Sequence, residues 1–488
     1  MNMPNSNWTT IVGLEIHAEL LTESKMFSAC PVVDSVTAPP NTAVDPVSMG
    51  LPGTLPVINK RALEMAMMVG LALNCEIPPF NQFARKSYFY PDLPKGYQIS
   101  QYDRPLCVNG YVDIDLSDGS TQRIRIRRAH LEEDTGKSMH TMDGSLIDLN
   151  RAGVPLLEIV TEPDIHSAEA AEAYARKLRT ILQYLGVNDG DMSKGIMRIE
   201  PNISVQHKDD TDYRTRTEVK NLNSIRSLYR SIEYETTRQI KAWENGEGVR
   251  QATMGWDEAK QRTVVQRYKE SAEEYRYFPE PDLPVVEVSR EWVAEIRAGL
   301  PELPDAKRDR FMNELGLNRY DASVLVADQS VAHYFDAALA EGANAKSLAN
   351  WLIGQLFGLL NTHNVEREAI ESTQITPQQF AGLVKLVDGG TINKATGVIV
   401  LAEMFETGDD AQKIVDAKGL AQISDTGAVD AAIAQMIAEN PAWVEEYLSG
   451  KDKLFGPMMG KVMGILKGQG NPGIVKELLA KALEAKRG

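Results

Sequence analysis

The chain has 488 residues, a formal net charge of −16, and 43% hydrophobic and 25% charged residues. This length is enough for about two to four domains with sizeable cores. The acidic balance argues against binding nucleic acid over the whole surface, although it is compatible with a local basic patch. No apolar stretch approaches the roughly 18 residues that a membrane span needs, so no membrane association is expected.

The cysteine pattern and the first residues indicate the compartment. Cys30, Cys75 and Cys107 show no paired spacing, which is typical of a reducing compartment without a disulfide framework. The first ten residues contain neither a basic residue nor an apolar run, so no signal or transit peptide is expected. We therefore expect a cytoplasmic protein.

The first part of the chain mixes strand and helix patterns. In chain order the predicted elements are a strand at 11–17, a buried helix at 59–76, strands within 111–130, and helices at 167–186 and 224–243. The alternation within 111–130 favours antiparallel pairing. Residues 1–290 are therefore predicted to form an α+β domain with an antiparallel sheet.

The hydrophobic pattern of the sequence changes after residue 290, where one helical period follows another almost without interruption. Helices are predicted at 291–299, 305–315, 319–328, 330–340, 344–361, 376–387, 391–405, 409–417, 426–438, 441–449, 454–467 and 472–486. A break at Thr407-Gly408 divides this part. The prediction is an all-α helical domain at 291–405 and a helical tail domain at 406–488.

Residues 85–100 hold four aromatic side chains, two lysines, one arginine and two prolines. Proline disfavours a central strand and a helix interior, so a stiff loop is expected. Such a loop either contacts a ligand or packs as a structural turn. The sequence Pro-Asp-Leu-Pro at 91–94 recurs at 281–284. Either two similar loops flank one site, or the repeat is a coincidence.

Glu15 and His17 lie two residues apart on the first predicted strand and therefore share a face. A carboxylate and an imidazole on one face are able to bind a divalent metal or to move protons. A surface pair on an edge strand is the competing interpretation.

Arg123, Arg125 and Arg127 share one face of another predicted strand, and Glu132 and Glu133 follow closely. Guanidinium groups suit phosphate, and adjacent acids suit a hard cation such as Mg²⁺. A solvated arginine face with an acidic turn is the alternative. A phosphate-binding P-loop is excluded, because Leu131 stands where the motif before Lys137 needs glycine.

Two further segments alternate acids and bases. Arg198 shares a face with Glu200, and Glu218 shares one with Lys220. A concave sheet that binds a metal–nucleotide complex explains these polar faces, and a hydrated sheet face is the alternative. No serine or cysteine lies in a glutaminase-type nucleophile context.

Several stretches together resemble the B subunit of the tRNA-dependent amidotransferases, the aspartyl/glutamyl-tRNA(Asn/Gln) amidotransferase family. The matching stretches are Val-Gly-Leu-Glu-Ile-His at 12–17, Gly-Leu-Pro-Gly-Thr-Leu-Pro at 50–56, and residues 85–103, 130–140, 149–163, 216–224 and 275–284. They follow the family order and span nearly all of the first domain. The C-terminal helices resemble the family's helical and tail domains more weakly.

The resemblance implies that ATP phosphorylates the side-chain carboxylate of Asp-tRNA(Asn) or Glu-tRNA(Gln), and that ammonia then displaces the phosphate. It implies ATP and Mg²⁺ as cofactors and a heterotrimer with an amidase-type glutaminase subunit and a small third subunit. Phosphorylation supplies the leaving group that a carboxylate lacks, while Mg²⁺ and cationic side chains stabilise the transferring charge.

The motifs carry residue roles with them. Matched positions imply metal ligands and catalytic residues at Glu15, His17, Glu132 and Glu218, with Glu133 and Glu200 as further metal candidates. Lys86, Tyr88 and Lys220 would contact the phosphorylated or aminoacyl end, and Arg125, Arg127, Tyr88 and Arg198 are the candidates for binding the nucleotide. Tyrosines of the 85–100 loop would stack on the unpaired tRNA end.

One departure concerns zinc. Many relatives carry two cysteine pairs early in the chain, whereas this chain has Ser28, Cys30, Asp45 and Ser48 at those positions. A single thiol does not make a structural zinc site, so no zinc is expected.

The end of the chain differs in charge from the whole. Residues 451–488 hold eight basic and three acidic residues, a net charge of +5. A tail that contacts tRNA would have this excess, and so would a pair of solvated lysine-bearing helices.

Two other functions compete with the leading hypothesis. A tRNA-binding scaffold would leave all catalysis to its partners and would scatter the candidate acids over the fold. A stand-alone kinase or ligase for a small acid fits poorly with the basic tail and with the missing nucleotide-binding fingerprint.

Overall fold

The computed structural model describes residues 7–268, 275–422, 426–466 and 468–486. The chain divides into two compact units, residues 1–304 and 305–488. The first unit contains every described β-strand.

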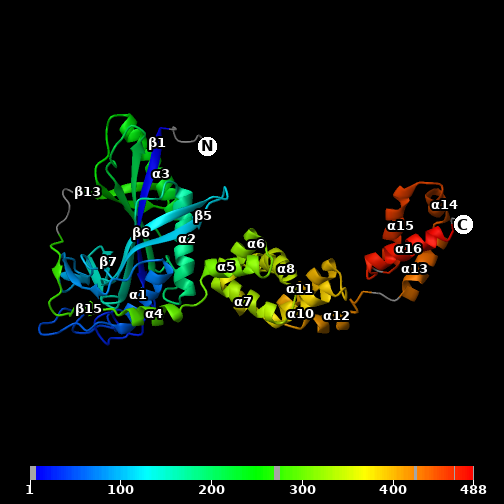
Figure 1. The fold of residues 1–488 in the computed structure, drawn as a ribbon, viewed down its shortest axis with the longest axis horizontal. Coiled ribbons are helices and arrows are strands. Elements are labelled where there is room, and N and C mark those ends of the chain that lie inside the picture. The colour runs from blue at the N-terminus through cyan, green and yellow to red at the C-terminus, as the bar shows by residue number, and fades with distance from the viewer. Residues whose placement is uncertain (1–6, 269–274, 423–425, 467, 487–488) are drawn as a thin grey trace. The chain divides into compact units, whose positions relative to one another are not determined.

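An eight-stranded sheet forms the first unit (Figure 1), in the order β13-β12-β11-β10-β1-β9-β6-β5. Its strands are β1 (Trp8–Glu19), β5 (Cys107–Asp115), β6 (Thr121–Glu133), β9 (Pro155–Thr161), β10 (Met197–His207), β11 (Thr217–Lys220), β12 (Ala252–Asp257) and β13 (Arg262–Tyr268). Only the β11–β12 pair is parallel. The predicted α+β class with an antiparallel sheet is confirmed.

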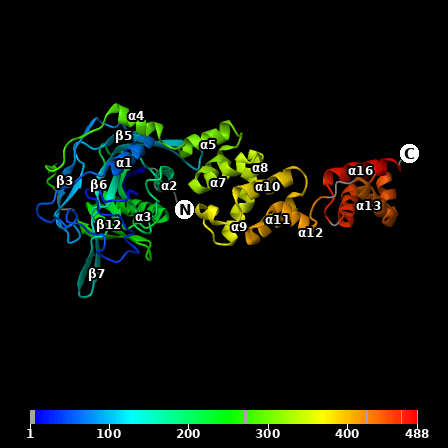
Figure 2. The same cartoon turned by 90° about the horizontal axis from the view of Figure 1, so that it is seen from below.

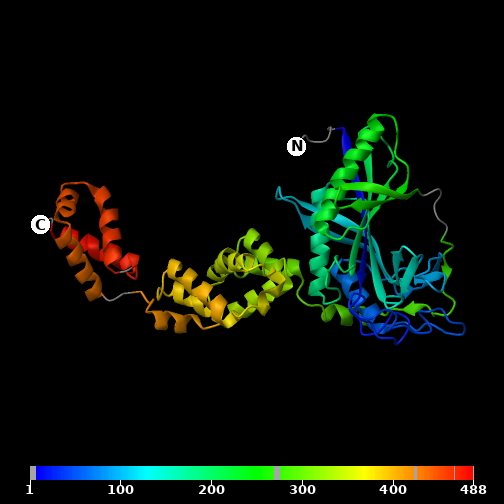
Figure 3. The same ribbon diagram turned by 180° about the vertical axis from the view of Figure 1, so that it is seen from behind.

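One face of this sheet is apolar and covered by helices. It contributes buried residues such as Leu14, Ile16, Ile159 and Ile199 to a single core. The helices are α1 (Lys60–Ala72), α2 (Ala168–Tyr184) and α3 (Ile225–Glu244). Figure 3 shows α2 and α3 along the same side of the sheet. Burying one face leaves the alternate residues of every strand on the opposite face.

A β-bulge in β6 sets which residues reach that opposite face. Ile126 pairs with Thr161 and Arg128 with Val160, so Arg127 is an extra residue. An extra residue reverses the alternation of side chains. Before the bulge the even-numbered residues face the core, and beyond it the odd-numbered ones do. The arginine stripe and the later histidine and acid of β6 therefore share one face.

The aromatic segment 85–100 is only partly a loop. β3 (Ala84–Ser87) pairs with β4 (Tyr97–Ser100), and the prolines fall in the connection between them, where they interrupt no strand. The second aromatic–proline segment lies beside the first, because β14 (Phe278–Pro279) pairs with β3. Arg85 of β3 also donates a hydrogen bond from Nε to Oε2 of Glu280, next to β14, at 2.6 Å. The two similar segments are thus neighbours in space.

Smaller pairings complete the unit. β2 (Phe80–Asn81) pairs with β15 (Val286–Glu287), and β7 (Lys137–Thr141) pairs with β8 (Gly144–Asp148). The β7–β8 hairpin projects from the rest of the first unit (Figure 2).

The second unit is helical throughout its described part. Its helices are α5 (Pro304–Asn313), α6 (Arg319–Val326), α7 (Gln329–Ala340), α8 (Ala345–Trp351), α9 (Phe357–Thr362), α10 (Pro377–Asp388), α11 (Lys394–Thr407), α12 (Ala411–Lys418), α13 (Thr426–Glu439), α14 (Pro441–Leu448), α15 (Phe455–Ile465) and α16 (Pro472–Glu484). A π-helical turn, Leu352–Leu356, joins α8 to α9 within the predicted helix 344–361.

The structure moves both predicted domain boundaries. The first unit continues to residue 304, because α4 (Arg290–Ala298) packs Trp292 and Ile296 on the sheet core. The boundary predicted near 405 also moves toward the C-terminus, because α12 packs on the helices before it. Its residues Ile414 and Val415 lie in one core with α10 and α11. A separate core begins with α13. Across the described ranges no helix is long and apolar enough to cross a membrane.

Two glycines let α1 approach β5, and they provide a stability test. A Cβ on Gly70 would lie 2.3 Å from Cys107 Sγ. We expect Gly70→Ala to destabilise the first unit by about 1–3 kcal/mol, the usual cost of overpacking. Adding Cys107→Ala removes the overlapping sulfur and should restore most of the loss in thermal unfolding.

Gly110 is the matched control. A Cβ there would meet Cys75 Sγ at 2.3 Å and the Leu73 carbonyl oxygen at 2.6 Å. Cys75→Ala should therefore fail to rescue Gly110→Ala, because the backbone clash remains. Equal rescue at both sites would contradict this packing argument.

Candidate metal and nucleotide site

The polar face of the sheet is centred on β1. Glu15 and His17 alternate along this strand, opposite Glu200 and Arg198 of β10. β1 lies between β9 and β10 in the middle of the sheet. The alternative of a surface pair on an edge strand is therefore excluded.

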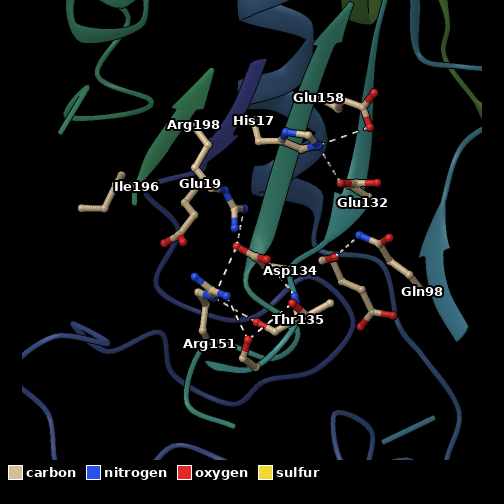
Figure 4. Close-up of polar contacts among 12 residues, drawn as sticks. His17, Glu19, Gln98, Glu132, Asp134, Thr135, Arg151, Glu158, Ile196 and Arg198 are labelled. Carbon is tan, nitrogen blue, oxygen red and sulfur yellow. Dashed lines mark hydrogen bonds and ion pairs between the residues drawn. The ribbon is translucent and has the colours of Figure 1, made fainter. Parts of the chain in front are cut away.

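His17, Glu132 and Glu158 form one group, here called the His17 cluster (Figure 4). One ligand atom from each lies within 4.8 Å of the others. His17 Nε2 is 3.6 Å from Glu132 Oε1 and 3.5 Å from Glu158 Oε2. The three side chains come from β1, β6 and β9, which are neighbours in the sheet.

The charges of this cluster attract a cation. Burial alone would lower the pKa of His17, but its hydrogen bond to Glu158 and the charges of Glu158 and Glu132 raise that pKa to about 9. Burial and the charge of Glu158 raise the pKa of Glu132. Glu132 Oε2 is buried without a hydrogen-bond partner in the described structure. Burial lowers the pKa of the neighbouring His130 to about 4.

Glu15, Glu200 and Glu218 form a second group, the Glu15 cluster, with ligand atoms again within 4.8 Å of one another. Burial, followed by the charges of Glu158 and Glu218, raises the pKa of Glu15. Lys220 Nζ lies 2.8 Å from Glu200 Oε2 and 3.4 Å from Glu218 Oε1. The lysine offsets part of the negative charge that three carboxylates bring together.

The four predicted ligands thus belong to two adjacent clusters, which corrects the expectation that they surround one cation. His17 and Glu132 lie in one cluster, and Glu15 and Glu218 in the other. Glu158 completes the first cluster and was missed as a ligand. Its signal in the sequence was an acid within the apolar run Leu156–Val160, but only the pairing of His17 with Glu158 reveals its role.

Lys86 and Tyr88 lie beside the His17 cluster. Burial would lower the pKa of Lys86, but the nearby charge of Glu132 is the largest of the effects that raise it. Its ammonium lies 5.0 Å from the Tyr275 ring centre and 5.8 Å from that of Tyr88. The Tyr88 hydroxyl donates to Gln98 Oε1 at 3.2 Å. Lys86 is therefore a buried cation close to Glu132 and Glu158, and its contact with the phosphorylated or aminoacyl end stays a prediction.

Glu133 and Arg198 are engaged elsewhere. Glu133 forms an ion pair with Lys95 and accepts the Ile99 N–H at 3.0 Å, so it anchors β4 instead of joining a cluster. Arg198 donates to Asp134 at 2.7 Å, beside Arg151 (Figure 4). The structure groups Glu133 with neither set of metal ligands, and the predicted nucleotide role of Arg198 must compete with Asp134.

A pocket of about 840 Å³ borders both clusters, because one residue of each lies in its lining. It is lined by Glu15 and Glu158, and by arginines 125, 127, 128, 214 and 216 among other residues. Arg125 pairs with Asp164 at 2.7 Å and Arg127 with Glu162 at 2.8 Å. The predicted arginine stripe thus reaches the pocket, but its charge is already partly balanced.

The four positions 28, 30, 45 and 48, where the sequence predicts no zinc, form a hydrogen-bonded group around a buried lysine. Lys25 is fully buried and donates to the Ala43 carbonyl at 2.7 Å. It lies 4.0 Å from Asp45, which accepts the Ser48 hydroxyl at 2.6 Å. A buried ammonium beside Cys30, the one thiol among these four positions, would repel a zinc ion.

We expect the protein to bind no zinc at this position. After incubation with excess zinc and gel filtration, emission spectroscopy should find substoichiometric zinc. A zinc-selective chelator, added at constant Mg²⁺, should leave the thermal unfolding of the first unit unchanged, because no zinc is part of its folding energy. One zinc per chain would contradict the prediction.

Known proteins resemble this chain over nearly its full length. Residues 10–294 match the GatB/GatE catalytic domain family, and residues 333–483 match the GatB domain family. The B subunit of the aspartyl/glutamyl-tRNA(Asn/Gln) amidotransferase of Caldicellulosiruptor saccharolyticus is 50% identical, covering 98% of this chain and 99% of the relative. The proteins of the same name from Thermodesulfovibrio yellowstonii and Herpetosiphon aurantiacus are each 48% identical, with the same coverage. The chain therefore belongs to the family of aspartyl/glutamyl-tRNA(Asn/Gln) amidotransferase B subunits.

Proposed function

We propose that this chain uses ATP to phosphorylate the side-chain carboxylate of Asp-tRNA(Asn), Glu-tRNA(Gln) or both, and then amidates it with ammonia. The observation that carries the proposal is the pair of acidic clusters along β1, each of which contributes one residue to the lining of the same pocket. Buried carboxylates at this density are costly unless cations compensate them.

The donor sets suit magnesium. Oxygen ligands dominate both clusters, and the unpartnered Glu132 Oε2 leaves a position for a ligand bond. His17, Glu132 and Glu158 would hold one cation, and Glu15, Glu200 and Glu218 a second. When bound, Mg²⁺ neutralises phosphate charge during transfer.

The remaining side chains position the reactants. The side-chain carboxylate of the aminoacyl group would attack the γ-phosphorus of ATP, ADP would leave, and ammonia would then attack the acyl phosphate and release phosphate. Lys86 and Lys220, each beside one cluster, would stabilise the developing negative charge. The pocket arginines would bind the nucleotide phosphates, with Arg125 and Arg127 exchanging their carboxylate partners.

The alternative of a tRNA-binding scaffold requires the candidate acids to be scattered, and their convergence speaks against it. The proposal places the protein in the cytoplasm within a heterotrimer. An amidase-type subunit would supply ammonia by hydrolysing glutamine, and a small third subunit would complete the assembly.

Amide formation by the purified complex tests the proposal. Each mischarged tRNA is supplied separately with ATP, Mg²⁺ and ammonium as the nitrogen donor, so that glutamine hydrolysis is bypassed. We expect amide product and ADP in equal amounts for at least one of the two tRNAs. Amide formation without ATP consumption would contradict the proposal.

A further inference from the structure

A buried carboxylate lies under the Glu15 cluster, on the helix-covered side of the sheet. Glu235 of α3 is fully buried and pairs with Arg238, whose Nη2 lies 2.6 Å from Glu235 Oε1. It also accepts hydroxyl hydrogen bonds from Thr217 at 2.7 Å and from Thr263 at 2.8 Å. A buried carboxylate with this many donors holds them in fixed positions.

Thr217 connects this carboxylate to a candidate ligand. It is the residue before Glu218 on β11, so their side chains point to opposite faces of the sheet. β11 has four residues, and only two of them pair with β10. On its other side all four residues pair with β12, and the Thr217 bond to Glu235 attaches the strand from below as well.

Gln239 extends the same network to β10. Its amide donates to Glu235 Oε1 at 3.0 Å and to the Ile203 carbonyl at 3.0 Å. The residue before Ile203 is Asn202, whose side-chain amide donates to Glu15 Oε1 at 3.0 Å. The network therefore ends one residue from two side chains on the polar face of the sheet. These are Glu218 of β11 and Asn202 of β10, which holds Glu15.

We infer that Glu235 is a positioning residue, which sets the register and height of β10 and β11 so that Glu218 and Glu15 meet at one cation. This inference rests on the proposed function of the Glu15 cluster. Glu235 touches no substrate and acts only through Thr217 and Gln239. Groups that orient metal ligands typically change metal affinity or activity about 10- to 100-fold when they are removed.

Thr217 and Thr263 allow a matched test. Both are buried, both donate one hydroxyl to Glu235, and both are replaced by valine with little change in shape. Only Thr217 adjoins a cluster residue, whereas Thr263 lies on the edge strand β13. Each variant is assayed in the complete complex for thermal unfolding and for the Mg²⁺ concentration that gives half-maximal amidation with ammonium.

We expect both valine variants to lower the unfolding temperature, because each leaves the same carboxylate short of one donor. Thr217→Val should lower it further, because the Thr217 hydroxyl also accepts from the Gln239 amide at 2.9 Å. Thr217→Val should raise the half-maximal Mg²⁺ concentration by about tenfold or more, and Thr263→Val by less than about twofold. Thr217→Ser keeps the hydroxyl and should restore the normal Mg²⁺ requirement. Glu235→Gln should shift this requirement at least as far as Thr217→Val.

Equal Mg²⁺ requirements for the two valine variants would overturn the inference and leave Glu235 as a stability residue. Glu218→Gln separates this outcome from a failure of the proposed function. If Glu218→Gln retains normal Mg²⁺ dependence and rate, the Glu15 cluster is not part of the reaction, and the proposed function of this cluster falls together with the inference.

Discussion

Glu132→Ala and His17→Ala should each abolish ATP-dependent amidation when ammonium is the nitrogen donor. Both side chains belong to the His17 cluster, and the buried Oε2 of Glu132 has no hydrogen-bond partner among the described residues. Removal of outer-shell groups alone costs about 10- to 100-fold, so loss of a ligand should cost more than about a hundredfold. The measurement is the rate of amide formation at saturating ATP and tRNA.

Two controls make this experiment decisive. Glutamine hydrolysis by the complex should survive in part, because the described residues of this chain show no glutaminase nucleophile. Glu172→Gln is the matched charge change on α2, where Glu172 pairs with Arg176 at 2.7 Å; it should leave the rate unchanged. Near-normal amidation in either cluster variant would move the chemistry to another subunit.

Removal of residues 426–488 should weaken tRNA binding and leave the rest of the chain folded. The helices from α13 onward have a core of their own, whereas a cut at 406 would remove α12 from the core it shares with α10 and α11. Charge within this segment is divided: residues 426–450 carry four acids and no base, and residues 451–488 carry a net +5. The basic part is therefore the candidate surface for binding phosphate.

Charge substitutions test the binding of tRNA phosphate by residues 451–488 more directly than the deletion does. Lys453, Lys461 and Lys476 are exposed on the basic part, and changing all three to glutamine should lower tRNA affinity. The slope of log affinity against log salt should fall by about 0.9 for each phosphate that the variant no longer neutralises. The matched control neutralises the exposed acids Asp430, Glu439 and Glu445, and it should not weaken binding. Equal affinities and slopes for the lysine variant and the unchanged protein would show that these lysines are solvated surface.

Local patterns in the sequence determined most of the elements. The helix predicted at 167–186 spans Ala168–Tyr184 and begins after Ser167, whose side chain caps it by accepting the Ala170 N–H. Alternation along 11–17 put Glu15 and His17 on one face, and the structure confirms this placement. These features depend on near neighbours in the chain, so the sequence alone carries them. The motifs that resemble the family likewise identified it before any tertiary information.

Only the tertiary structure decided which residues meet. Strand register joined Glu158 to His17 and Glu200 to Glu15, and so divided one expected site into two clusters. The bulge at Arg127 brought the arginine stripe and Glu132 to the same face. In the sequence the only trace of the bulge is the adjacent pair Arg127-Arg128, where the apolar positions change from even to odd numbers. Register and bulges are chosen by the packing of the whole sheet against its helices, and a one-residue shift moves every later side chain to the other face.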